Sequence, residues 1–96
     1  MNILSFQDDL TEEVFHGIHT HAVRKKFTPE LLIAAERKLD ILNATDSLES
    51  LTKIPDHRAE NNVRDVHGKH SIPIDDKCRI LFRFNDDGIA DVEIKF

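Results

Sequence analysis

The sequence of 96 residues has no tryptophan, no tyrosine and only one cysteine, Cys78. A single cysteine excludes an intramolecular disulfide and any zinc site that needs several thiolates. The six phenylalanines are the only Phe, Trp or Tyr side chains, and a core of this size needs them. We therefore expect no aromatic platform on which nucleic-acid bases stack. The single cysteine is in addition typical of a protein in a reducing compartment.

Glycine and proline are also scarce, with three residues of each, and no Gly/Ser-rich linker or low-complexity tract divides the chain. No apolar run approaches the length that spans a membrane. The first ten residues lack the basic and apolar regions of a signal peptide. We therefore expect a single domain over residues 1–96, with one modest core, no membrane partner and a cytoplasmic location.

Positive charge is in deficit: 13 Lys and Arg stand against 18 Asp and Glu, for a formal net charge of −5 at pH 7. Indiscriminate binding to nucleic acid requires clustered Lys and Arg that neutralise phosphates, so the negative net charge argues against such binding. The basic residues gather at 24–26 and between 53 and 83. A small local basic face is therefore still compatible with the composition.

Two helices are predicted in the N-terminal half, over 8–17 and 28–45. Residues 18–27 are either a connection between them or a broken continuation of the first helix. Thr28 is placed to cap the second helix, and Pro29 suits its first position. The residues that form its predicted buried stripe are Leu31, Ala35, Leu39 and Leu42. A short strand over 3–6 and a turn over 47–51 are weaker predictions.

The C-terminal half reads as sheet, with strands predicted over 57–63, 69–75, 78–84 and 89–96. The last two form a hairpin whose apolar faces must coincide, which leaves a three-residue loop before Ile89 with Gly88 in the left-handed position. The predicted pairs are Arg79–Lys95, Ile80–Ile94, Leu81–Glu93, Phe82–Val92, Arg83–Asp91 and Phe84–Ala90. The expected fold class is α+β, with two N-terminal helices packed on a twisted antiparallel sheet.

The strand over 78–84 places two arginines on one face, and their predicted neighbours differ. Arg83 has a carboxylate opposite, which favours a solvated ion pair. Arg79 faces Lys95 with only a diagonal carboxylate near, so it is a candidate for bidentate binding of an anion. His57 and His70 flank this region and could serve as general acid or base, although the pattern alone favours partly exposed strand histidines without such a role. The six histidines lack metal-ligand spacing, and we expect neither metal nor cofactor.

Four segments taken together carry a resemblance to a known family: "AERKLDILNATDSLESL" (35–51), "PDHRAE" (55–60), "GKHSIPIDDKCRILFRF" (68–84) and "DVEI" (91–94). In their order and spacing they resemble the HigB branch of the RelE/ParE toxin superfamily. The resemblance implies the toxin of a type II toxin–antitoxin system, a metal-independent endoribonuclease that cuts messenger RNA on the ribosome. It also implies a HigA-like helix-turn-helix antitoxin, through which alone the toxin would reach operator DNA.

The resemblance also assigns roles to individual residues. Arg79 falls on the arginine of the family's Arg-Ile/Leu-x-Phe strand and would stabilise the phosphate attacked by the 2′-hydroxyl. Proton transfer would fall to His70 or His57. The residues expected to hold the substrate are Lys69, Arg58 and Arg83.

Three features depart from the family pattern. Pro73 stands where the family usually has a cation on the active face, the closing Tyr- or His-containing tail is absent, and the net charge is negative. These departures favour a second hypothesis, a catalytically defective RelE-fold protein that acts through antitoxin binding and operon regulation. A ParE-like inhibitor of DNA gyrase is a third.

Overall fold

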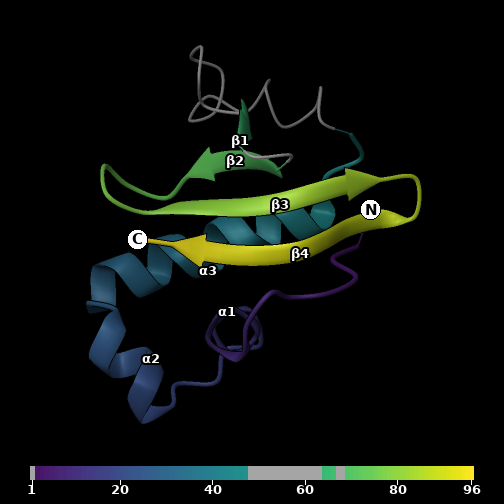
Figure 1. Ribbon diagram of the computed structural model, residues 1–96. Coiled ribbons are helices and arrows are strands. Elements are labelled where there is room, and N and C mark those ends of the chain that lie inside the picture. The colour runs from purple at the N-terminus through teal and green to yellow at the C-terminus, as the bar shows by residue number, and fades with distance from the viewer. Residues whose placement is uncertain (1, 48–63, 67–68) are drawn as a thin grey trace.

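The computed structural model describes residues 2–47, 64–66 and 69–96, and of 64–66 only the backbone. Its elements are, in chain order, α1 (Asp9–Phe15), α2 (His21–Lys26), α3 (Pro29–Ala44), β1 (Arg64–Val66), β2 (Lys69–Pro73), β3 (Arg79–Asn85) and β4 (Gly88–Lys95). The strands form one antiparallel sheet in the order β1-β2-β3-β4 (Figure 1). The α+β class is confirmed. The strand predicted over 57–63 and all but the first residue of the turn over 47–51 lie outside the described residues.

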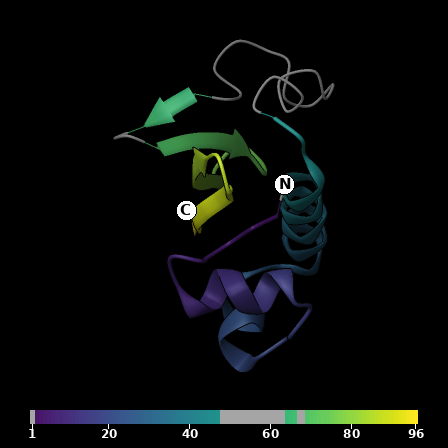
Figure 2. The ribbon, with the colours of Figure 1, turned by 90° about the vertical axis from the view of Figure 1, so that its right-hand side faces the viewer.

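The helices lie to one side of the sheet. Figure 2 shows α3 running along one face, with α1 and α2 beyond the β4 edge. The helix predicted over 28–45 is confirmed, because the N–H of Leu31 donates to Thr28 Oγ1 (3.1 Å) and Pro29 takes the first position. The helix predicted over 8–17 is also confirmed, as α1, with Asp8 as its cap.

The connection predicted over 18–27 contains a third helix, α2, so the expectation of two helices was wrong. Its cap is Thr20, whose Oγ1 accepts from the N–H of Val23 (3.2 Å). Val23 is the only buried residue of this helix. A single buried position in a six-residue segment gives no hydrophobic periodicity from which a helix could be predicted. The helix is stabilised instead by the packing of Val23 in the core.

The core lies between α3 and the helix-facing side of the sheet. On α3, the predicted Ala35, Leu39 and Leu42 are fully buried, whereas Leu31 is half-buried and Leu32 is the buried residue of the first turn. The buried hydrophobic residues of β2, β3 and β4 are Ile72, Ile80, Phe82, Ile89, Val92 and Ile94. The alternation along β3 thus selects the face that the sequence predicted.

The hairpin of β3 and β4 follows the predicted register in its first half only. The observed pairs are Arg79–Lys95, Ile80–Ile94 and Leu81–Glu93, followed by Arg83–Ala90, Phe84–Ile89 and Asn85–Gly88. The register shifts between Leu81 and Arg83, and Asp91 on β4 has φ 54°. The bulge adds one unpaired residue to β4, so the predicted Phe84–Ala90 and Arg83–Asp91 pairs are wrong. For the same reason the hairpin loop has two residues and not three.

The N-terminal segment, residues 2–7, runs parallel to β4 and covers its edge. The predicted strand over 3–6 is present only as bridges, Ile3 to Ile89 and Phe6 to Val92. Four backbone hydrogen bonds join the segment to β4: Leu4 N–H to Ile89 O (2.6 Å), Ile89 N–H to Asn2 O (3.0 Å), Val92 N–H to Ser5 O (3.1 Å) and Gln7 N–H to Val92 O (2.8 Å). An edge strand whose ladder groups are satisfied in this way cannot pair with another chain.

Gly88 is required where the N-terminal segment meets β4, and its replacement tests that contact. Its φ is 147°, and a Cβ there would lie 2.5 Å from Asn2 O, whereas at Gly17 (φ 71°) the nearest atom would be 3.9 Å away. We expect Gly88→Ala to lower the free energy of unfolding by roughly 2–4 kcal/mol, from strain and overlap. Gly17→Ala, the control, should cost about 1 kcal/mol. Urea denaturation measures both, and equal losses would contradict the close approach.

Thr11 joins α1 to β4 through a buried hydrogen bond, because its Oγ1 accepts from the N–H of Ile94 (3.0 Å) and its side chain is fully buried. Thr11→Val keeps the shape and removes the acceptor. We expect a loss of about 1–3 kcal/mol, since the Ile94 N–H is left unsatisfied. Amide hydrogen exchange at Ile94 should become faster in Thr11→Val and stay protected in Thr11→Ser. Unchanged protection in the valine variant would show that this bond contributes nothing.

Candidate functional site: the open face of the sheet

The sheet has one face toward the helices and one face that no described helix covers (Figure 2). We call the second the open face. Ile72, Ile80 and Phe82 point inward and are fully buried, so the residues between them point outward. The open face carries Lys69, Ser71 and Pro73 of β2, Arg79, Leu81 and Arg83 of β3, and Ala90, Glu93 and Lys95 of β4.

Arg79 lies at the start of β3, between Pro73 and Lys95, its register partners on the two neighbouring strands. Its Nε donates to Ser71 Oγ (3.0 Å) and its Nη2 donates to the Ser71 carbonyl (3.4 Å). Ser71 is buried and Lys95 is exposed. The guanidinium is therefore held over β2 by two hydrogen bonds, with a second cation across the strand pair, as the predicted Arg79–Lys95 register required.

Arg83 forms the ion pair that the sequence predicted, although through the bulge and not through direct opposition. Its Nε lies 3.2 Å from Asp91 Oδ2, and both side chains are about half exposed (50% and 44%). An exposed pair of this kind contributes about 0–1 kcal/mol to stability. Arg83 is thus a partly neutralised cation on the open face.

Lys69 is more deeply placed than a substrate-binding surface lysine would be. Its side chain is 13% exposed, and its Nζ lies 3.7 Å from Glu93 Oε1. The same Nζ donates to the carbonyl of Asp91 (3.3 Å) and to Gln7 Oε1 (3.5 Å). Lys69 therefore spans the open face from β2 to β4 and binds the backbone of the bulge.

His70, predicted to move protons beside Arg79, lies on the other face of the sheet. It is the register partner of Phe82, and the two ring centroids are 5.8 Å apart. Arg79 bonds to Ser71, the next residue of β2, whose side chain points to the open face. The structure therefore does not bring His70 and Arg79 together. His57 and Arg58 lie outside the described residues.

Two residues that lie against Arg79 on this face were not included in the predicted site. Ser71 orients Arg79, and Lys95 places a cation beside it. The hairpin register predicted from the sequence already placed Lys95 opposite Arg79. The part played by Ser71 depends on the pairing of β2 with β3, which the sequence did not fix.

Cys78 is not available as a nucleophile. It is 1% exposed, and burial, helped by the charge of Asp75, raises the pKa of its thiol to about 11. The thiol therefore stays protonated at neutral pH. Over residues 2–47 and 69–96, no group of three or more His, Cys, Asp or Glu side chains is placed to hold a metal ion. In the same part of the chain, every helix is too short or too polar to cross a membrane.

Comparison of the chain with known proteins identifies no relative: no family model matches the sequence, and no curated protein matches it. A proposal of function therefore depends on the residues and the geometry described above.

The raised pKa of Cys78 predicts a loss of stability at high pH. The unfolded thiol ionises above pH 9, whereas the folded thiol resists ionisation up to about pH 11. Between these values the unfolded state releases a proton that the folded state keeps, so unfolding becomes more favourable as pH rises, by up to roughly 3 kcal/mol. Urea denaturation at pH 8 and pH 10.5 should show a larger drop for the wild type than for Cys78→Ala. Equal drops would contradict the shift.

Proposed function

We propose that this protein is the toxin of a type II toxin–antitoxin system of the RelE/HigB kind, a metal-independent endoribonuclease that cuts translated messenger RNA. Three things support the proposal: the sequence resemblance, the order of helices followed by an antiparallel sheet, and the cations on the sheet face opposite α3. Its partners would be the ribosome with its message, and a helix-turn-helix antitoxin that restrains it and binds the operator. The reaction takes place in the cytoplasm.

The observation that carries the proposal is the arrangement around Arg79. In the proposed reaction the 2′-hydroxyl of the RNA attacks the adjacent phosphate, which acquires negative charge in the transition state. Arg79, held by Ser71 and paired across the strands with Lys95, would stabilise that charge. Arg83, half exposed on the same strand, would contact the RNA backbone. Because His70 faces the helices, His57 is the better candidate for proton transfer.

A second candidate function is a non-catalytic one: a RelE-fold protein that binds its antitoxin and takes part in operon control. Two observations favour it. His70 and Arg79 lie on opposite faces of the sheet, and the residue of β2 opposite Arg79 is Pro73, which carries no charge. A face that binds phosphate without moving protons would retain affinity for RNA and lose the acceleration of roughly 10²–10⁴-fold that acid–base catalysis provides.

Primer extension on translated messages, after induced expression in a bacterial host, tests the first function. We expect cleavage by the wild type and a reduction of about 10²–10³-fold in Arg79→Ala, since a preorganised stabiliser of transition-state charge is lost. Arg83→Ala makes the same charge change on the same face of β3, and we expect it to reduce cleavage less than about tenfold, because Asp91 already offsets that charge. Thermal unfolding should confirm that both variants fold.

The outcomes separate the candidate functions. Cleavage that persists in Arg79→Ala would remove Arg79 from the active site. No cleavage by the wild type, with tight binding to the product of an adjacent helix-turn-helix reading frame, would favour the non-catalytic protein. Induction of the DNA-damage response without broken messages would instead indicate inhibition of gyrase.

A further inference from the structure

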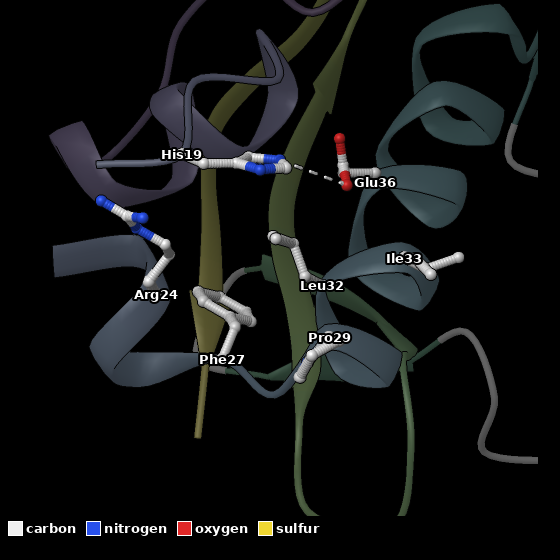
Figure 3. A pocket seen from close by; sticks show the side chains of 7 residues that line it. All are labelled: His19, Arg24, Phe27, Pro29, Leu32, Ile33 and Glu36. Atoms are coloured by element: carbon white, nitrogen blue, oxygen red, sulfur yellow. Dashed lines mark ion pairs between the residues drawn. The ribbon is translucent and has the colours of Figure 1, made fainter. Parts of the chain in front are cut away.

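A groove of about 410 Å³ lies between α2 and the first half of α3, on the helical side of the molecule (Figure 3). Its lining residues are His19, Arg24, Phe27, Pro29, Leu32, Ile33 and Glu36. Phe27 and Leu32 are 5% and 8% exposed and belong to the core, so they form the floor. Ile33 is 68% exposed. The groove is therefore an apolar depression that opens directly onto the core.

The lining residues of α3 form a side of the helix that adjoins the buried stripe and shares Leu32 with it. Pro29, Leu32, Ile33 and Glu36 are spaced as i, i+3, i+4 and i+7, so they follow one side of the helix. A single exposed isoleucine needs no explanation. Ile33, however, continues a concave apolar surface, and such a surface is stabilised when another apolar group covers it.

The border of the groove along α2 is basic. Arg24, Lys25 and Lys26 form the last turn of α2, all three are exposed, and no acidic residue occurs in its first turn. Arg24 itself lines the groove, and Lys26 also lies over the ring of Phe96 (4.8 Å). This concentration of positive charge occurs in a chain whose net charge is −5. The border would therefore attract a negatively charged occupant and repel a basic one.

The opposite border is formed by Glu36, which faces His19 across the mouth of the groove. The distance between His19 Nε2 and Glu36 Oε1 is 3.9 Å, and both side chains are partly exposed (Figure 3). The polar groups thus lie at the rim, while the interior is formed by Phe27, Pro29 and Leu32. A small polar ligand would need polar groups that converge inside the groove, which this arrangement does not provide.

We propose that the groove docks one amphipathic helix of a partner protein, with large apolar side chains over Phe27 and Leu32 and carboxylates along the side that faces Arg24. Two helices border the groove, and a third laid against them buries apolar residues at i, i+3, i+4 and i+7. An extended peptide would instead need a sheet edge with unpaired backbone groups. The docking is independent of RNA cleavage, because the groove is lined by residues of the helical region and contains none of the open-face residues.

Titration of the ¹⁵N-labelled protein with two synthetic helical peptides tests the proposal. Both are about 16 residues long, which favours helix formation, and have leucine at i, i+3, i+4 and i+7. One carries glutamate along one flank and the other carries lysine. We expect the glutamate peptide to shift the amide resonances of α2 and of residues 29–36, and to bind at least about tenfold more tightly than the lysine peptide. The difference should shrink at high salt.

Matched variants locate the binding. Ile33→Gln places glutamine, a good helix former, at an exposed position of α3. It should weaken the binding of the glutamate peptide at least about tenfold. Leu4→Gln replaces another exposed apolar residue (52% exposed, against 68% for Ile33) beside Gly88, at the far end of β4, and should leave binding unchanged. Arg24→Glu should reverse the preference between the two peptides. Lys77→Glu, in the exposed turn before β3, makes the same net charge change and should not.

Three results would overturn the proposal. One is the absence of binding by the glutamate peptide, and another is equal binding of the two peptides. The third is a concentration-dependent dimer of the protein that Ile33→Gln abolishes, because it would assign the groove to a second copy of this chain. Binding of the glutamate peptide that Ile33→Gln weakens and Leu4→Gln does not would support docking, whatever the outcome of the cleavage experiment.

Discussion

The backbone pairing between the N-terminal segment and β4 is the constraint on which the rest of the fold depends. Residues 2–7 satisfy the outer edge of β4, and the chain then leads directly into α1, whose Thr11 accepts from the N–H of Ile94. The same pairing explains Gly88, because Asn2 O approaches too closely for a side chain. The edge of β4, the position of α1 and the β3–β4 hairpin are thereby coupled, so that none of them can shift alone.

The bulge at Asp91 follows from this pairing and decides the charge distribution of the open face. The N–H of Asp91 donates to Ser5 Oγ (2.9 Å), and its carbonyl accepts from Lys69 Nζ. Lys69 is therefore committed to the bulge and to Glu93, and Arg83 to the Asp91 carboxylate. Toward the end of β4, Arg79 and Lys95 sit side by side, with Ser71 fixing the guanidinium. The candidate anion site is thus at one end of the face.

Two local basic regions on an acidic chain suggest two different partners. On the open face Arg79 and Lys95 lie opposite each other on β3 and β4, and the proposed function assigns them to phosphate. The limited charge of this face disfavours indiscriminate RNA binding. The border of the groove along α2 is basic beside an apolar floor, which suits an acidic amphipathic helix. The groove is lined by residues of the helical region, and no residue of the open face lines it. A helix seated in the groove would not contact Arg79, so restraint of the proposed nuclease would require further contacts made by the same partner.

The sequence by itself determined the features that depend on neighbouring residues. Thr28 and Pro29 set the start of α3, and alternation in β3 set its buried face and the pairing of Arg79 with Lys95. Only the tertiary structure decided the bulge, since Ser5 lies 86 residues from Asp91. It also decided α2 and the positions of Lys69 and His70, which depend on how β2 pairs with β3. Caps and alternation act within a few residues, whereas hydrogen bonds between distant segments exist only once the chain has folded.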